Sequence, residues 1–218
     1  MAKKKRKRIL KPSKAYLAFE KTIERSLNLT ELVKPVELII KAKRTEANVD
    51  ASDLLRASLV IGVAAMDSYF TGIFAERFIK YIQKEGVNDK IVEILEKANF
   101  TIEVALELLA MDRPYRRLRT RIDEHLSKCT TQNTHVIDDL FLAFRLKQFS
   151  KNISKLKNRK SLISSINSAV KRRHQIVHEG DLNSHDKMNP IIQKYVKQKL
   201  NDIVTYVAGA DEILRNQL

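Results

Sequence analysis

The sequence of 218 residues contains little glycine and proline, with five and four residues respectively. Tight turns between β-strands use these two residue types, so their scarcity argues against a β-sandwich or a β-barrel. The chain has no tryptophan and a single cysteine, Cys129. One cysteine excludes an intrachain disulfide framework and a cysteine-based zinc site, and it fits a reducing compartment. We expect Cys129 to be an inert, half-buried residue.

Long apolar runs are also missing. The longest, residues 59–66, is far shorter than a membrane span and lies between Arg56 and Asp67. No apolar segment follows the basic start, as one would in a signal peptide. We therefore expect a protein that is neither secreted nor embedded in a membrane and that works in the cytoplasm. In a eukaryotic host the same basic start would favour nuclear import.

Acidic residues are the minority, with 26 against 41 lysines and arginines, which gives a net charge of +15. Eight positive charges precede the first acidic residue, Glu20, and they belong to Lys3, Lys4, Lys5, Arg6, Lys7, Arg8, Lys11 and Lys14. We expect residues 1–11 to form a disordered basic arm that contacts a polyanion, and nucleic acid is the leading candidate. A nuclear localisation signal and an inert tail are the alternatives.

Helical periodicity fills the rest of the chain, because apolar residues recur there at spacings of three and four. It predicts a single all-α domain over residues 12–218. Ser13 opens the first helix, Thr30 is a candidate cap for the second, and Asp50 and Asp53 open a long third helix that Gly86 ends. Further helices are expected over 91–95, over 102–109 with Thr101 as its cap, over 115–126, 136–149 and 161–178, and from Asn189-Pro190 onward.

Basic residues also gather within the helix predicted over 115–126. Arg116, Arg117 and Arg119 are candidate nucleic-acid contacts, because a row of arginines on one helix can track a phosphate backbone. An ordinary solvated helix face is the alternative interpretation.

The segment from Lys171 to Asp181 carries the most chemistry. His174 and His178 are four residues apart, so both lie on one face of a helix. Histidine can donate or accept a proton near neutral pH, and the forks of Arg172 and Arg173 match phosphate oxygens. These groups suffice for metal-free RNA cleavage, in which the 2′-hydroxyl attacks the adjacent phosphate. Spacing alone is weak support, because Arg119 and His125 form a second such pair.

The whole segment Arg173-His174-x-Ile-Val-His178-Glu-Gly-Asp181 resembles the active-site motif of the HEPN superfamily, and more narrowly of its RiboL-PSP-type branch. That motif is an arginine, a polar residue and, a few residues later, a histidine that Glu-Gly-Asp often follows. His174 occupies the polar position, where asparagine is commoner. The segment 61–69 resembles an earlier core helix of the family, with a polar residue at Asp67.

The resemblance implies a HEPN-like helical bundle that dimerises with its motif helices face to face. Arg173 would bind the scissile phosphate, His178 would transfer protons, and His174 would orient RNA or His178. Asp67 would be a supporting partner of these side chains. It also implies a prokaryotic defence or toxin setting, with an antitoxin or other defence protein as a partner.

We therefore expect a homodimeric, metal-independent endoribonuclease that needs no cofactor and acts on RNA. Ile163, Ile166, Val170 and Val177 give the motif helix an apolar face, for the dimer or for packing within one chain. A non-catalytic nucleic-acid-binding module is the main alternative. A protein-interaction bundle whose charge keeps it soluble is the other.

Overall fold

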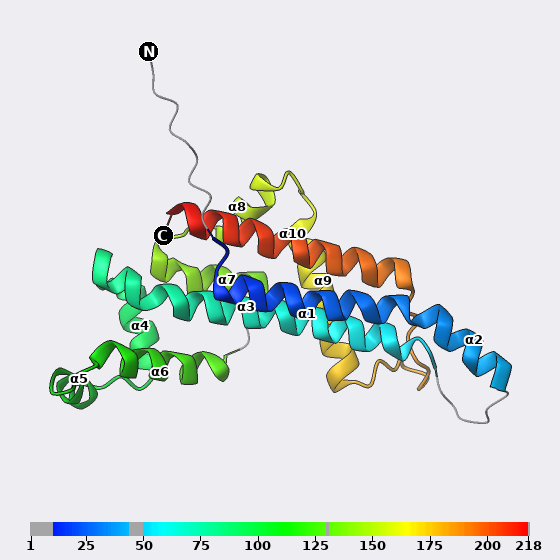
Figure 1. The fold of residues 1–218 in the computed structure, drawn as a ribbon, viewed down its shortest axis with the longest axis horizontal. Helices are drawn as coiled ribbons and strands as arrows, with labels where there is room; N and C mark the ends of the chain where they lie inside the picture. Colours follow the sequence, from blue (N-terminus) through cyan, green and yellow to red (C-terminus); the bar gives the residue numbers. More distant parts are fainter. Residues whose placement is uncertain (1–10, 44–49, 130, 218) are drawn as a thin grey trace, which may run out of the picture.

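The computed structural model describes residues 11–43, 50–129 and 131–217 (Figure 1). These residues form helices and no β-strand, so the all-α prediction is confirmed. The elements are α1 (Lys14–Glu31), α2 (Val33–Lys43), α3 (Asp53–Glu85), α4 (Asp89–Lys97), α5 (Ile102–Leu109), α6 (Pro114–Ser127), α7 (Thr134–Phe141), the short 3₁₀ helix η1 (Leu142–Phe144), α8 (Phe149–Leu156), α9 (Leu162–His178) and α10 (Gln193–Gln217).

The long helix α3 is the centre of the bundle. It contacts α1, α6, α9 and α10, and in Figure 1 α1, α3 and α10 run side by side along the long axis. Its core side chains are at most 1% exposed, and they are Leu59, Val63, Met66, Tyr69, Phe70, Ile73, Phe74 and Phe78. By length and composition α3 could cross a membrane, yet 56% of its most apolar window is buried inside the bundle. The apolar content of α3 is therefore that of a core helix.

Several predicted helix ends are confirmed by their hydrogen bonds. Ser13 Oγ accepts a hydrogen bond from the Tyr16 amide (3.0 Å), and Thr101 Oγ1 accepts one from the Val104 amide (3.3 Å). Gly86 ends α3 with a φ of 79°, a left-handed conformation that glycine adopts without steric cost. These caps are local, so sequence spacing was enough to find them.

The single helix predicted over 136–149 is wrong. α7 ends at Phe141, η1 follows, and left-handed Gln148 (φ 51°) immediately precedes α8. One continuous helix would separate residues 141 and 149 by about 12 Å along its axis. The break instead brings the rings of Phe141 and Phe149 to a centroid distance of 4.8 Å, so core packing overrides the local periodicity.

Two predicted caps are also wrong. Thr30 lies inside α1, where its hydroxyl donates to the Leu27 carbonyl (2.7 Å), and α2 starts only after Leu32. Asn189 does not cap α10, which begins at Gln193. Its side-chain amide donates to the Asp181 carbonyl (3.0 Å) and its own carbonyl accepts from Arg56 (2.8 Å). Neither partner belongs to α10, which explains why the local pattern misled.

Gly62 is the closest approach of α3 to its neighbours. A Cβ there would lie 2.2 Å from Leu200 Cδ2 and 3.2 Å from Ser26 Oγ, and both of these residues are fully buried. We predict that Gly62→Ala lowers the free energy of unfolding by about 1–3 kcal/mol, as overpacking of a filled core does. Urea denaturation measures this loss.

Gly72→Ala, also on α3, is the matched control. A Cβ there meets only Ala15 Cβ, at 3.3 Å. The helix-forming preference of alanine over glycine, about 1 kcal/mol, offsets that crowding. Equal losses for the two variants would contradict the tight contact at Gly62.

Candidate active site

The two motif histidines lie side by side on the last turns of α9. The rings of His174 and His178 have a centroid distance of 4.5 Å and an angle of 40° between their planes. Both side chains are exposed, and α9 ends at His178. The four-residue spacing thus produces one solvent-facing pair of imidazoles.

Arg173 points in a different direction. Five residues of α-helix rotate its side chain by about 140° from that of His178. Arg173 lines a pocket of 420 Å³ whose wall also includes Asp67, Asp123, Cys129 and Gln132. Its Nε atom is buried and has no hydrogen-bond partner among the described residues. Within one chain, therefore, Arg173 lines a pocket whose wall includes neither His174 nor His178.

Asp67 lies on α3 and shares the pocket with Arg173, but its hydrogen bonds run elsewhere. Asp67 Oδ1 accepts from the amide and the hydroxyl of Thr131 (2.8 and 2.5 Å), and Oδ2 accepts from Gln132 Nε2 (3.0 Å). Asp67 therefore ties the segment before α7 to α3 and fixes one wall of the pocket. Thr131 and Gln132 were not among the sequence candidates, because no local pattern pairs them with Asp67.

Arg172 is half-buried and paired within the chain. Its Nη2 atom donates to Asp181 Oδ2 (2.9 Å) and to the carbonyls of Pro190 (3.2 Å) and Asn189 (3.3 Å). These contacts give Arg172 a structural role that the sequence did not indicate. The phosphate contact expected of it stays a prediction.

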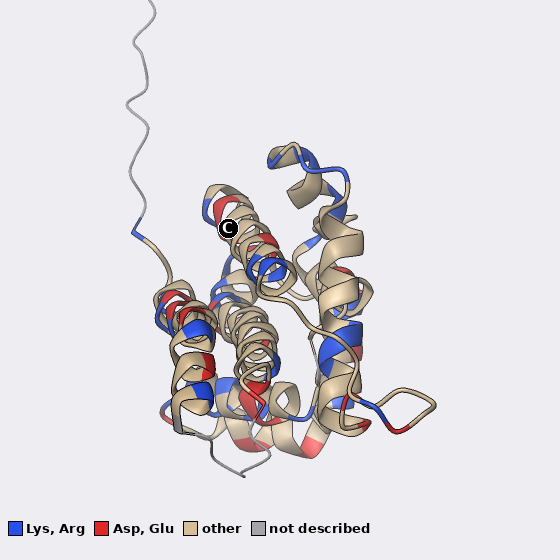
Figure 2. Ribbon diagram, turned by 90° about the vertical axis from the view of Figure 1, so that its right-hand side faces the viewer, with Lys and Arg blue, Asp and Glu red and all other residues tan. Residues whose placement is uncertain are grey.

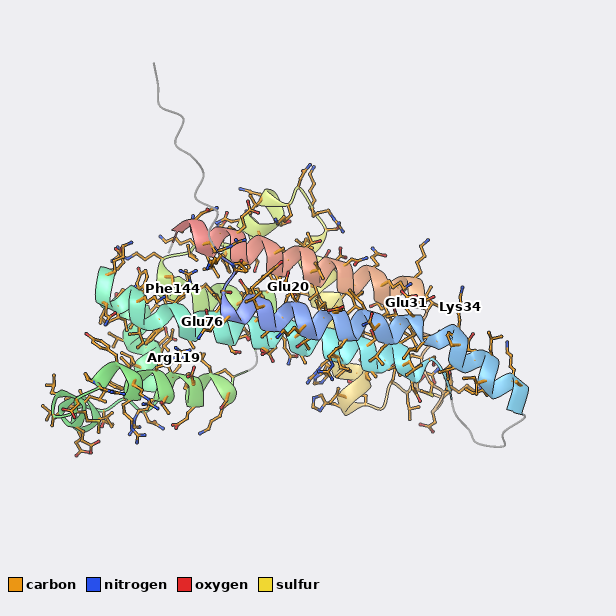
Figure 3. All side chains as sticks on the ribbon, in the orientation of Figure 1. Glu20, Glu31, Lys34, Glu76, Arg119 and Phe144 are labelled. Carbon is orange, nitrogen blue, oxygen red and sulfur yellow. The ribbon has the colours of Figure 1, made fainter. Side chains whose placement is uncertain are left out.

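The arginines of α6 lie on a helix that packs against α3, and Figure 3 labels Arg119 among them. Arg116, Arg117 and Arg119 are exposed, and Arg119 Nε lies 3.7 Å from Asp123 Oδ2. Partial burial raises the pKa of Asp123, and Arg119 opposes this shift. Lysine and arginine are spread over several outer faces, as Figure 2 shows. On the same helices, aspartate and glutamate lie between these basic residues.

The second arginine–histidine pair from the sequence, Arg119 and His125, does not form a comparable site. His125 is partly buried, and its Nε2 lies 3.6 Å from Cys129 Sγ. Desolvation lowers the pKa of His125, with smaller contributions from Lys97 and Lys128. The environment of His125 therefore disfavours its charged form, and its ring faces the thiol of Cys129. The α9 histidines instead face solvent.

The remaining predictions concern metal ligands and the basic arm. Among the described residues no three His, Cys, Asp or Glu side chains gather as metal ligands. Of the basic arm only Lys11 belongs to the described part of the chain, so Lys3, Lys4, Lys5, Arg6, Lys7 and Arg8 lie outside it.

The model of one protein family, RiboL-PSP-HEPN, matches residues 20–216 of the chain. The match includes every helix from α2 to α9 and the whole motif on α9. The chain belongs to the RiboL-PSP-HEPN family. Neither the comparison with curated proteins nor that with solved structures gave a match. The helical bundle of this HEPN domain agrees with the fold that the motif implied.

Asp67 offers a test of how the pocket of this HEPN domain is built. Asp67→Asn replaces charge-assisted hydrogen bonds from Thr131 and Gln132 with weaker neutral ones. We predict a loss of about 1.5–3 kcal/mol in the free energy of unfolding, measured by urea denaturation. Asp139→Asn is the control, because the Asp139 carboxylate is exposed and pairs only with Lys90 at the surface. An equal, small effect of both variants would contradict the role of Asp67.

Proposed function

We propose that this HEPN domain is a metal-independent endoribonuclease. The observation that carries the proposal is the exposed pair of imidazoles, His174 and His178, at the end of α9 in a chain of this family. Imidazoles are the side chains best suited to proton transfer near neutral pH. The nearby Arg173 pocket supplies a cation that matches a phosphate group in geometry and charge.

In the proposed reaction the RNA is its own nucleophile. The 2′-oxygen attacks the adjacent phosphorus while a base, assigned to His178, removes the 2′-hydroxyl proton. The bond from phosphorus to the 5′-oxygen breaks, and an acid protonates that leaving oxygen. The products are a 2′,3′-cyclic phosphate and a free 5′-hydroxyl. Arg173 stabilises the negative charge that grows on the phosphate oxygens, and His174 orients the RNA or His178.

A homodimer would complete the site. Because Arg173 and His178 of one chain diverge by about 140° around α9, we assign the meeting of an arginine and a histidine at one phosphate to a second copy of the chain. Ile166 and Val170 are buried within the chain, at 0% and 6% exposure, so only part of the apolar face expected on α9 is free. Exposed apolar residues lie within and after the motif, and we assign them to the dimer contact: Val177, Leu182, Met188 and Ile192.

A non-catalytic nucleic-acid-binding module is the second candidate. The exposed arginines of α6 favour it, because they offer phosphate contacts without any of the catalytic groups. A cytoplasmic prokaryotic defence or toxin role, with an antitoxin partner, is the setting that the family resemblance suggests for the nuclease.

Replacement of one histidine tests the nuclease directly. We predict that His178→Ala lowers RNA cleavage about a hundred- to ten-thousandfold without unfolding the protein, because an exposed proton carrier is removed. His185→Ala is the matched control, since His185 is an exposed histidine in the loop after α9, outside the imidazole pair. Cleavage is measured in EDTA, with end-group analysis for the 2′,3′-cyclic phosphate.

Three outcomes separate the candidate functions. EDTA-resistant cleavage that 2′-O-methylation of the RNA stops supports the nuclease. Full cleavage by His178→Ala would refute the assignment of that residue. Salt-sensitive RNA binding without cleavage by the wild-type protein would favour the binding module.

The proposed homodimer, in which the site combines residues of two chains, makes a separate prediction about Arg173. Arg173→Ala should lose activity to a degree similar to His178→Ala. Arg173→Lys should recover it only in part, because an ammonium group lacks the planar fork. Sedimentation over a concentration series should show a dimer. A wild-type protein that cleaves RNA while it remains monomeric would rule out the composite site.

A further inference from the structure

A buried carboxylate lies just after the imidazole pair in the chain. Asp181, three residues after His178, has a fully buried side chain. Its Oδ2 atom accepts hydrogen bonds from Arg56 Nε (2.7 Å) and Arg172 Nη2 (2.9 Å), and these two arginine side chains are 7% and 16% exposed. One carboxylate therefore joins α3 to α9 at the point where the motif helix ends.

The backbone around Asp181 closes the same junction. The Asp181 amide donates to the Gln175 carbonyl (3.1 Å) in the last turn of α9, and the Asp181 carbonyl accepts from the Asn189 amide (2.8 Å). Gly180 and Asp181 both have left-handed backbones, with φ of 63° and 58°. The chain thus reverses immediately after His178 and returns beneath the final helical turn. For a residue other than glycine, this conformation persists only where surrounding contacts impose it.

The hydrogen-bond network extends to Asn189, in the segment that connects α9 to α10. Arg56 Nη2 donates to the Asn189 carbonyl (2.8 Å), and Arg56 Nη1 donates to Asp53 Oδ1 (3.2 Å). Arg56 Nη1 also lies 3.9 Å from Asp50 Oδ2, and the Asp50 and Asp53 carboxylates are both exposed. Asp181 is therefore the buried counter-charge of the two arginines, and its removal leaves buried positive charge without that partner.

We propose that Asp181, held by Arg56 and Arg172, is a positioning residue that fixes the last turn of α9 and so the place of His178. The proposal rests on the nuclease assignment for its effect on cleavage. The physical reason is that carbonyls and side chains in a terminal helical turn lack the hydrogen bonds of the helix interior and fray without a tertiary anchor. His178 is exposed, and its ring packs against that of His174, which is exposed as well. The junction at Asp181 supplies that anchor.

Asp181→Asn is the central variant, because it keeps the side-chain shape and removes the charge. Asp211→Asn is its matched control. Asp211 is also fully buried and lies 2.7 Å from an arginine, Arg215 Nε, but it stands about 27 Å along α10 from the end near the motif. Both variants should lose stability. Only Asp181→Asn should disturb α9.

Two measurements are made on each protein. The first is amide hydrogen exchange at residues 175–178, which we expect to become at least tenfold faster in Asp181→Asn, relative to the rest of α9, and to stay unchanged in Asp211→Asn. The second is the saturated rate of RNA cleavage under conditions where both variants are folded. We expect kcat to fall about ten- to a hundredfold in Asp181→Asn with little change in KM, because the histidine is misplaced while RNA binding remains.

Arg56→Lys covers the case in which Asp181→Asn does not fold. It keeps the positive charge and removes the fork that reaches Asp181 and Asn189 together, so the same two changes are expected in weaker form. Native exchange at residues 175–178 in these variants, or an equal fall of kcat in Asp211→Asn, would overturn the proposal. If the wild-type protein cleaves no RNA, the nuclease assignment fails, and the exchange data still decide whether Asp181 anchors α9.

Discussion

The burial of α3 on nearly all sides is the constraint on which the rest of the structure depends. Tyr69, Phe70, Phe74 and Phe78 are removed from water, and each such side chain contributes about 1.5–3 kcal/mol to folding. A helix that must be covered all round needs several partners, which α1, α6, α9 and α10 provide. Gly62 sets how closely α1 and α10 approach. The break at residues 142–148 follows from the same demand, because it folds Phe141 and Phe149 onto one core.

Polar contacts then determine which way the side chains of the motif point. The packing of α9 on α3 leaves His174 and His178 in solvent and turns Arg173 into a pocket whose wall Asp67 organises. The end of α9 is joined to α3 by Asp181 and Arg56. In the proposed nuclease this arrangement separates stability from reactivity, because buried ion pairs hold the helix and the imidazoles face solvent. The divergence of Arg173 from His178 also gives a physical reason for a second copy of the chain.

Local signals in the sequence were sufficient wherever the physics is local. Ser13 and Thr101 cap helices through amides three residues away, and the apolar periodicity predicted a long third helix that Gly86 ends. The four-residue spacing placed both imidazoles on one face of α9. Predictions failed where distant partners decide the backbone. Asn189 resembles a helix cap, yet Arg56, 133 residues earlier, holds its carbonyl. Thr30 resembles another, yet α1 runs through it because the apolar face of that helix continues against α3.

The sequence by itself determined the all-α class, the limits of most helices and the motif that marks the RiboL-PSP-HEPN family. These properties depend on periodicity, capping and residue identity over a few positions. Only the tertiary structure decided which motif groups face one another. It paired Arg172 with Asp181 inside the chain, set Arg173 beside Asp67, and left the two histidines exposed. The physical reason is that burial and charge pairing depend on contacts between residues such as Arg56 and Asp181, which are 125 positions apart and share no local pattern.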